Sequence, residues 1–195
     1  MSKKIMLLCG SPRKRGNTNR VAAWVAQAAR EQGADVEIVD AASLNYKSLG
    51  CTACMKCQKL EEFRCVIDDE ATPILARMPE ADAVVLATPV YFHGPTAQLK
   101  LLIDRMYSLV KFTGPAPVTA FKNTAFALIA TGGGPMDDGL ASLEQAFGSI
   151  AASLQFPFES LLVPLAPANP EDIEGNAELK EKAAALGRKL AGARP

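Results

Sequence analysis

Three short segments of this chain combine residue types that could do chemistry, although they lie far apart in the sequence. Residues 10–19 read GSPRKRGNTN, residues 51–65 hold four cysteines, and residues 89–94 read PVYFHG. The first segment combines a glycine-containing loop with an excess of basic side chains, which favours a bound anion. The second offers thiolates to a metal. The third can place aromatic faces and backbone amides against a flat ring.

The first segment offers several hydrogen-bond donors to an anion. Ser11 and Thr18 carry hydroxyl groups, Asn17 and Asn19 carry amides, and Arg13 carries a charged guanidinium. A helix that begins here would add free backbone N–H groups and the positive end of its dipole. A phosphate monoester fits this set, although the order of residues matches neither the P-loop nor the dinucleotide fingerprint. The alternative is that Asn17 or Thr18 only caps the helix.

The segment at residues 89–94 carries Tyr91, Phe92 and His93 between a proline and a glycine. We expect these residues to line a flat ring, and the alternative for the two aromatic side chains is burial in the core. His93 is the single histidine of the chain, and polar packing explains it better than a role as general acid or base. Farther along, the glycines at 132–134 would let a ring approach the backbone closely, or else form a flexible turn.

The cysteines favour ligand chemistry over a disulfide scaffold. The chain has five, an odd number, and Cys51, Cys54, Cys57 and Cys65 have the spacing C-x2-C-x2-C-x7-C. Zinc sites usually pair two C-x2-C units, whereas three thiolates in one run followed by a fourth are typical of a [4Fe-4S] cluster. A cluster, free thiols without a metal and zinc therefore stay open as alternatives. Cys9 lies in an apolar run, and we expect it in the core.

The elements that must position these segments alternate along the chain. Apolar runs predict strands at 4–9, 34–40, 81–88, 122–131 and 155–164, and helical periodicity predicts helices at 17–32, 96–110, 138–154 and 176–190. This alternation predicts an α/β fold of three layers, with helices on both faces of a five-stranded parallel sheet. We expect the strand order 2-1-3-4-5.

This topology brings the polar segments together. Ligands of open α/β sheets bind outside the carboxyl ends of the strands, where the strand order reverses. The segments that follow the first, third and fourth predicted strands are 11–19, 89–94 and 131–134. The sequence therefore predicts one site at one edge of the sheet, built from all three.

Composition limits the class of protein. A chain of 195 residues with 49% hydrophobic content suits a single domain over 1–195, with a cysteine-rich loop at 49–68. Basic and acidic residues number 21 each, which draws the protein to neither nucleic acid nor an acidic membrane. We see neither a secretory signal nor an apolar stretch of the roughly 20 residues that span a bilayer, and expect a cytoplasmic location.

The combined motifs resemble a known family. GSPRKRGNTN, then CTACMKC with Cys65 and VIDDE, then ATPVYFHGPTAQLKLLIDR are similar to the NAD(P)H-dependent FMN reductases, which are flavodoxin-like proteins. Within that family, the cysteine spacing resembles the iron-sulfur flavoproteins. The resemblance covers residues 3–134, and it implies only the general fold beyond them.

The resemblance implies a role for each motif residue. It implies that the FMN phosphate is held by Ser11, Arg13, Asn17, Thr18 and Asn19. It implies that the isoalloxazine is lined by Pro89, Val90, Tyr91, Phe92, His93 and Gly94, and that the far edge of the ring is closed by Thr131, Gly132 and Gly133. It further implies that a cluster is held by Cys51, Cys54, Cys57 and Cys65. It also implies a homodimer or homotetramer, with the cysteine loop reaching across a subunit boundary.

Three functions follow as hypotheses. The first is an FMN-dependent oxidoreductase that passes electrons from NAD(P)H to flavin, a quinone or another small acceptor. No catalytic side chain is needed, because the flavin carries the chemistry. The second is an iron-sulfur flavoprotein that relays electrons between a ferredoxin-like protein, a [4Fe-4S] cluster and FMN. The third is a zinc-binding module without redox activity.

Overall fold

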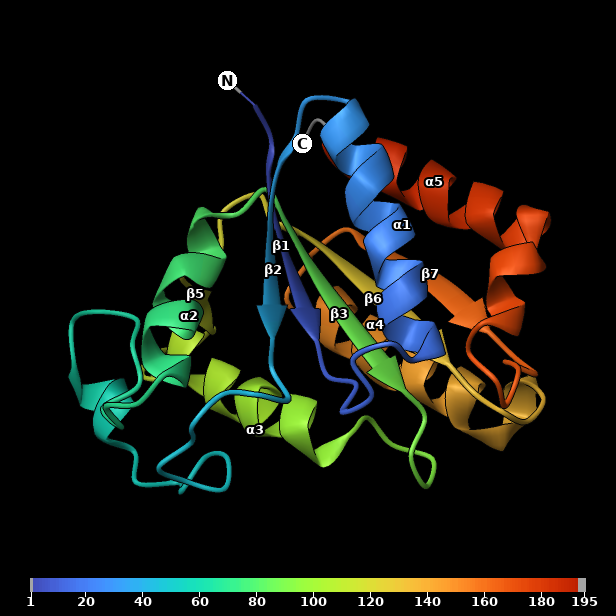
Figure 1. The fold of residues 1–195 in the computed structure, drawn as a ribbon. Helices are drawn as coiled ribbons and strands as arrows, with labels where there is room; N and C mark the ends of the chain where they lie inside the picture. Colours follow the sequence, from blue (N-terminus) through green and yellow to red (C-terminus); the bar gives the residue numbers. More distant parts are fainter. Residues whose placement is uncertain (1, 193–195) are drawn as a thin grey trace.

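The computed structural model describes residues 2–192, and a parallel β-sheet forms its centre (Figure 1). The sheet consists of β1 (Lys4–Cys9), β2 (Asp35–Asp40), β3 (Ala83–Pro89), β6 (Ala125–Thr131) and β7 (Phe158–Val163). The strands lie in the order β2-β1-β3-β6-β7, and all neighbours are parallel. The predicted α/β fold with strand order 2-1-3-4-5 is confirmed, and this is the order of flavodoxin-like sheets.

Burial explains why the central strands read as continuous apolar runs. β1, β3 and β6 are buried over almost their whole length, since helices cover both faces of the sheet. β2 lies at an edge and buries only Val36 and Val39. The three central strands therefore give the loops at their carboxyl ends a rigid base.

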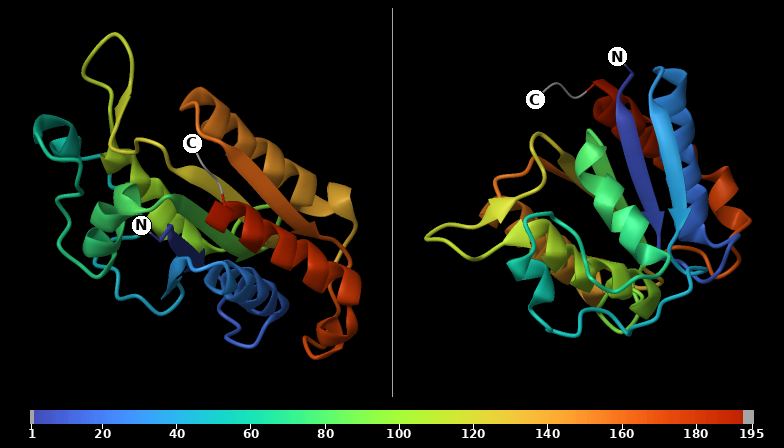
Figure 2. Two further views of the ribbon diagram at one scale, coloured as in Figure 1. Left: turned by 90° about the horizontal axis from the view of Figure 1, so that it is seen from above. Right: turned by 90° about the vertical axis from the view of Figure 1, so that its left-hand side faces the viewer.

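Within residues 2–192, α-helices cover both faces of the sheet (Figures 1 and 2). The first face carries α1 (Asn17–Glu31) and α5 (Ala177–Gly192), and the second carries α2 (Ala71–Arg77), α3 (Ala97–Arg105) and α4 (Ala141–Ser153). Each face has its own apolar core. None of the helices within residues 2–192 combines the length and the apolar character that crossing a membrane requires.

The segment after α3 differs from the prediction. The helix expected at 96–110 ends as an α-helix at Arg105, and a 3₁₀ turn over Met106–Leu109 follows it. β4 (Val110–Lys111) then pairs with β5 (Val118–Thr119) in an antiparallel ribbon across a turn rich in glycine and proline. This pairing removes residue 110 from the predicted helix.

Two further helical features were not predicted. α2 has only seven residues, which is too short for its apolar periodicity to stand out. The helix expected from residue 138 begins as an α-helix only at Ala141, because Gly139 has a φ of 101° that no α-helix accommodates.

A buried group of polar atoms joins the ends of β1 and β3 to the start of α3. The Thr96 hydroxyl donates to the Gly10 carbonyl at 2.7 Å and accepts the Leu99 amide at 3.3 Å. The Thr96 amide donates to the Thr88 hydroxyl at 3.0 Å. A Cβ on Gly10 would lie 2.5 Å from the Leu99 Cβ, so only glycine allows this approach. Through these contacts the loop at residues 11–19, after β1, and the loop at residues 89–94, after β3, are tied to the start of the same helix.

We expect Thr96→Val to destabilise the fold. The change leaves the buried Gly10 carbonyl without its donor and α3 without its cap, which costs about 1–3 kcal/mol in the free energy of unfolding. Urea unfolding measures this loss. The control is Thr113→Val, an exposed position in the β4–β5 turn. Equal stability of the two variants would contradict this role of the Thr96 hydroxyl.

Candidate functional site

The three predicted loops surround one cavity at the carboxyl edge of the sheet. The cavity has a volume of about 190 Å³. Of the residues that the sequence singled out, it is lined by Ser11, Arg13, Asn17, Thr18, Pro89, Val90, Tyr91, Thr131, Gly132 and Gly133. The structure thus brings together parts of the chain that are more than a hundred residues apart. Their role as cofactor ligands stays a prediction.

One wall of this cavity was not predicted from the sequence. Residues 166–168, which follow β7, also line it. The Asn17 side-chain amide donates to the Pro167 carbonyl at 2.7 Å, which ties this wall to the start of α1. The contribution is a backbone carbonyl, so no side chain in the sequence signalled it.

Four predicted residues do not line this cavity. Asn19 lies against a separate hollow beside Cys9 and Asp40, and its side chain donates to the carbonyls of the first loop. Phe92, His93 and Gly94 belong to a tight turn in which the Tyr91 and Gly94 backbones pair with each other. Phe92 is fully exposed, so the alternative that it is buried in the core is wrong.

The tight turn after β3 has an uncommon backbone. Phe92 and His93 have φ values of 51° and 62°, the left-handed region that residues other than glycine rarely adopt. Such strain persists only where the surrounding structure imposes it, and it is concentrated at functional sites. The turn presents an exposed ring beside the cavity.

The start of α1 is open to an anion. Gly16 is the N-cap residue and supplies no capping side chain, so neither Asn17 nor Thr18 caps the helix, and the first turn contains no acidic residue. The first N–H groups of a helix lack intrahelical partners, and the helix dipole places positive charge there. Among the described residues, the buried Asn17 Oδ1 also has no hydrogen-bond donor. The cavity therefore offers donors for an anion and one acceptor for a hydroxyl group.

A buried hydroxyl pair joins the first loop to the third. The Oγ1 atoms of Thr18 and Thr131 lie 2.7 Å apart, and both residues are buried. This bond fixes the start of α1 against the end of β6, where Gly132 and Gly133 line the cavity. Thr18 thus shapes the cavity in addition to lining it.

All four predicted cysteines line a second, smaller hollow of about 20 Å³. Cys51 and Cys54 are exposed, Cys65 is half-buried and Cys57 is buried, and all four are free thiols. Figure 1 shows the segment between β2 and α2 passing beside α2 and α3. Arg105 and Tyr107, from the end of α3 and the turn after it, complete the lining.

The backbone of the cysteine loop is held by the β4–β5 ribbon. The buried Lys111 ammonium donates to the carbonyls of Cys57, Leu60 and Glu62, the last two at 2.9 Å. The Gln58 side chain donates to the Val110 carbonyl at 2.9 Å, and it accepts a hydrogen bond from the Phe112 amide at 2.9 Å. These contacts order a segment that has little regular structure of its own.

A buried ion pair holds the other end of the cysteine loop. Arg105 Nη1 lies 2.8 and 2.6 Å from the two carboxylate oxygens of Asp69, and both side chains are inaccessible to solvent. Burial alone would raise the pKa of Asp69, but the hydrogen bonds from Arg105 and from the Lys47 amide hold it below its usual value. Asp69 is therefore a carboxylate, and removing either partner would leave a buried charge.

The thiols share one hollow but do not form a single-ion site. Within residues 2–192, no three His, Cys, Asp or Glu side chains are arranged to hold one metal ion. Zinc draws four ligands into one tight tetrahedron. A four-iron cluster instead places one thiolate on each of four irons, so its ligands are spread more widely. The role of the four cysteines as ligands of a cluster stays a prediction.

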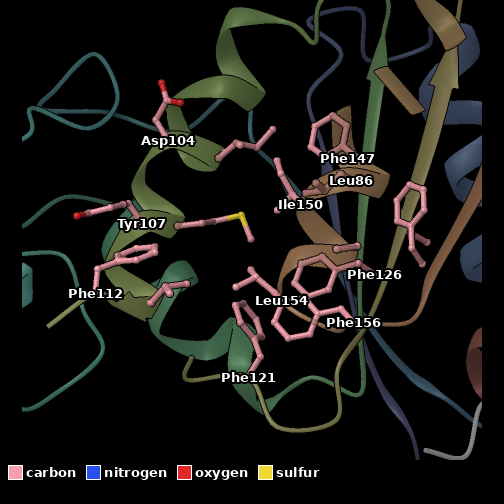
Figure 3. A pocket seen from close by; sticks show the side chains of 16 residues that line it. Leu86, Asp104, Tyr107, Phe112, Phe121, Phe126, Phe147, Ile150, Leu154 and Phe156 are labelled. Atoms are coloured by element: carbon pink, nitrogen blue, oxygen red, sulfur yellow. The ribbon is translucent and has the colours of Figure 1, made fainter. Parts of the chain in front are cut away.

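A third pocket, of about 340 Å³, opens between α3 and α4 (Figure 3). Its lining is almost wholly apolar and rich in aromatic rings, namely Tyr107, Phe112, Phe121, Phe126, Phe147, Phe156 and Phe158. Two side chains at this pocket, Phe112 and Ile150, are half exposed. No motif in the sequence predicted it, because its residues are scattered and individually typical of a core.

Comparison with known proteins gives one family match and several flavoprotein relatives. The family described as NADPH-dependent FMN reductase matches residues 3–158. An iron-sulfur flavoprotein of Methanocaldococcus jannaschii is 42% identical over 103 residues, which cover 52% of this chain and 51% of the relative. An iron-sulfur flavoprotein of Methanosarcina thermophila is 35% identical over 130 residues, which cover 67% of this chain and 63% of the relative. The chain thus spans only part of the length of these curated relatives.

Two solved structures have the same fold. The NAD(P)H:quinone oxidoreductase from Methanothermobacter marburgensis superposes with a TM-score of 0.74 at 15% identity, covering 100% of both chains. An FMN-dependent NADH-azoreductase from Bacillus anthracis, solved in complex with FMN, gives 0.72 at 13% identity and covers 97% of this chain and 100% of that one. At such identities the likeness shows the fold alone. The family match extends over most of the chain, which therefore belongs to the NADPH-dependent FMN reductase family.

Proposed function

We propose that this chain is an FMN-dependent oxidoreductase that takes electrons from NAD(P)H and passes them to flavin, a quinone or another small acceptor. One observation carries the proposal. The uncapped start of α1 opens onto the same cavity as the loops after β3 and β6. That combination suits a flat ring with a phosphorylated tail, and membership of the family supports it.

The residues around the cavity fit FMN. The first amides of α1, Ser11 and Arg13 would hold the phosphate, and the unpartnered Asn17 Oδ1 would accept a hydroxyl group of the ribityl chain. Residues 89–91 and 131–133 would lie along the ring. When bound, FMN supplies hydride and one-electron chemistry, and this chain orients it and shields it.

The remaining predicted residues stay in the proposal as outer contacts. Asn19 supports the first loop through the carbonyls of Arg13 and Lys14. Phe92, His93 and Gly94 form the exposed turn, where an incoming donor or acceptor would meet them. No side chain acts as a catalytic acid or base in this proposal.

The proposal treats residues 1–195 as one FMN-binding domain in the cytoplasm, without nucleic acid or membrane as partner. We infer a homodimer or homotetramer. Phe112 and Ile150 are half exposed at a pocket rich in aromatic rings. This supports a face that a second subunit covers, because contiguous apolar patches mark interfaces.

A second function has its own observation. The four cysteines share one hollow, which supports an iron-sulfur flavoprotein that relays electrons between a [4Fe-4S] cluster and FMN, with a ferredoxin-like protein as donor or acceptor. A zinc-binding module without redox activity is less well supported, since it would leave the cavity at the uncapped start of α1 unexplained.

We expect Arg13→Ala combined with Thr18→Ala to weaken FMN binding at least tenfold. The double change removes a cation from the cavity and the hydroxyl pair that shapes it. Fluorescence titration of the apoprotein with FMN measures the affinity. The control is Arg15→Ala, which removes a basic side chain from the same loop outside the cavity lining. An affinity as high as that of the control would contradict the placement of the phosphate.

Reduction by a nicotinamide tests the reductase. In the absence of oxygen, NADH or NADPH should bleach the visible absorbance of the FMN-loaded protein, because hydride transfer reduces the flavin. Riboflavin, which lacks the phosphate, should bind more weakly and be reduced less at equal concentration. Flavin that stays oxidised with both nicotinamides would exclude the reductase and leave the electron relay, whose donor is a protein.

Iron content tests the relay. After anaerobic reconstitution we expect about four iron atoms per chain, and Cys54→Ala should reduce this content strongly. Cys9→Ala is the matched control, since burial in β1 keeps that thiol from any ligand role and raises its pKa to about 12. Iron well below one atom per chain would exclude the relay, and uptake of zinc without FMN would support the non-redox module.

A further inference from the structure

Arg105 keeps one buried donor without an acceptor. Its guanidinium has five N–H groups. Nη1 donates to both oxygens of Asp69, and Nη2 donates to the Ile67 carbonyl at 3.0 Å and to the Thr72 hydroxyl at 2.8 Å. Among the described residues, Nε has no hydrogen-bond acceptor, although the side chain is inaccessible to solvent. A buried donor left unpaired costs free energy, so it points to a missing partner.

The hollow beside this donor contains sulfur. Arg105 lines it together with the four cysteines. Arg105 Nη2 donates to the carbonyl of Ile67, two residues after Cys65, so the guanidinium lies against the end of the loop that carries Cys65. Cys65 is therefore the cysteine nearest in sequence to the contacts of Arg105, and both residues line the hollow. A thiolate accepts a hydrogen bond from a guanidinium better than a neutral thiol does.

The buried charges around the cysteine loop are unbalanced. Arg105 is matched by Asp69, whereas the buried Lys111 ammonium contacts backbone carbonyls and no carboxylate in residues 2–192. A buried cation without a counterion is unfavourable. An anionic group bound by the cysteines would supply the missing charge.

We propose that Arg105 is a positioning residue for the cysteine site: once the cysteines hold an iron-sulfur cluster, its Nε–H donates to the Cys65 sulfur, fixes Cys65 as the fourth ligand and raises the reduction potential of that cluster. The inference rests on the relay proposed above. Donors outside the ligand set orient the ligands, and hydrogen bonds to cluster sulfurs raise the potential by stabilising the more negative reduced state.

The test compares the full chain with two variants that change the ion pair from opposite sides. Arg105→Lys keeps a cation beside Asp69 and removes the Nε–H. Asp69→Asn keeps the Nε–H and removes the anion beside it. Each protein is reconstituted with iron, sulfide and FMN without oxygen, and iron content and the midpoint potentials of cluster and flavin are measured. We expect a lower cluster potential in Arg105→Lys and an equal or higher one in Asp69→Asn, with the FMN potential unchanged in both.

A purely structural role gives a different pattern. If Arg105 only anchors the loop, both variants lose iron to the same degree, or keep the cluster at the potential of the unchanged protein, and either result overturns the inference. Should Arg105→Lys fail to fold, Asp69→Asn combined with Arg105→Met removes both charges without leaving one unpaired. Its cluster potential should then lie below that of Asp69→Asn alone, and equality overturns the inference.

Failure of the relay is distinguishable from failure of this inference. An unchanged protein that takes up no iron removes both. A cluster that assembles in the unchanged protein, with a potential insensitive to Arg105, leaves the relay standing and removes only the role of Arg105.

Discussion

Parallel pairing of β1, β3 and β6 is the constraint on which the rest of the molecule depends. Because all strands run the same way, every crossover must return over a face of the sheet, and all carboxyl ends meet at one edge. Loops that are distant in sequence are therefore brought together by the sheet itself, before any contact between the loops forms. The Thr18–Thr131 hydroxyl pair and the bond from the Thr96 hydroxyl to the Gly10 carbonyl adjust a spacing that the sheet has already determined.

The cysteine segment obeys a different rule. It lies between β2 and α2, outside the sheet, so hydrogen bonding within the sheet does not order it. Its order comes from two buried cations, Lys111 on its carbonyls and Arg105 on Asp69 and Ile67. Cations suit this task because the loop presents carbonyls, a carboxylate and sulfurs, all of which accept hydrogen bonds. Hydrogen bonds from buried cations thus order the loop, whereas the burial of apolar strands orders the sheet.

The sequence predicted the elements that follow from a local pattern of residues. It did not predict contacts that join distant parts of the chain. Strands that are continuous apolar runs, such as β3 and β6, were predictable with their order, and so was the meeting of three loops at one edge. The wall at 166–168 was not, since it contributes a carbonyl that any residue could supply. The ion pair of Arg105 with Asp69 was not either, because 36 residues separate the partners and Asp69 lies in a segment without regular structure.

The contacts of the β4–β5 ribbon also bear on local opening of the chain. A two-stranded ribbon is only marginally stable by itself, and here the side chain of Gln58 extends its hydrogen bonding into the cysteine loop. We therefore expect ribbon and loop to open together, as one cooperative unit, while the sheet stays intact. Amide hydrogen exchange at residues 110–119 would then report on the order of a loop some fifty residues earlier in the chain.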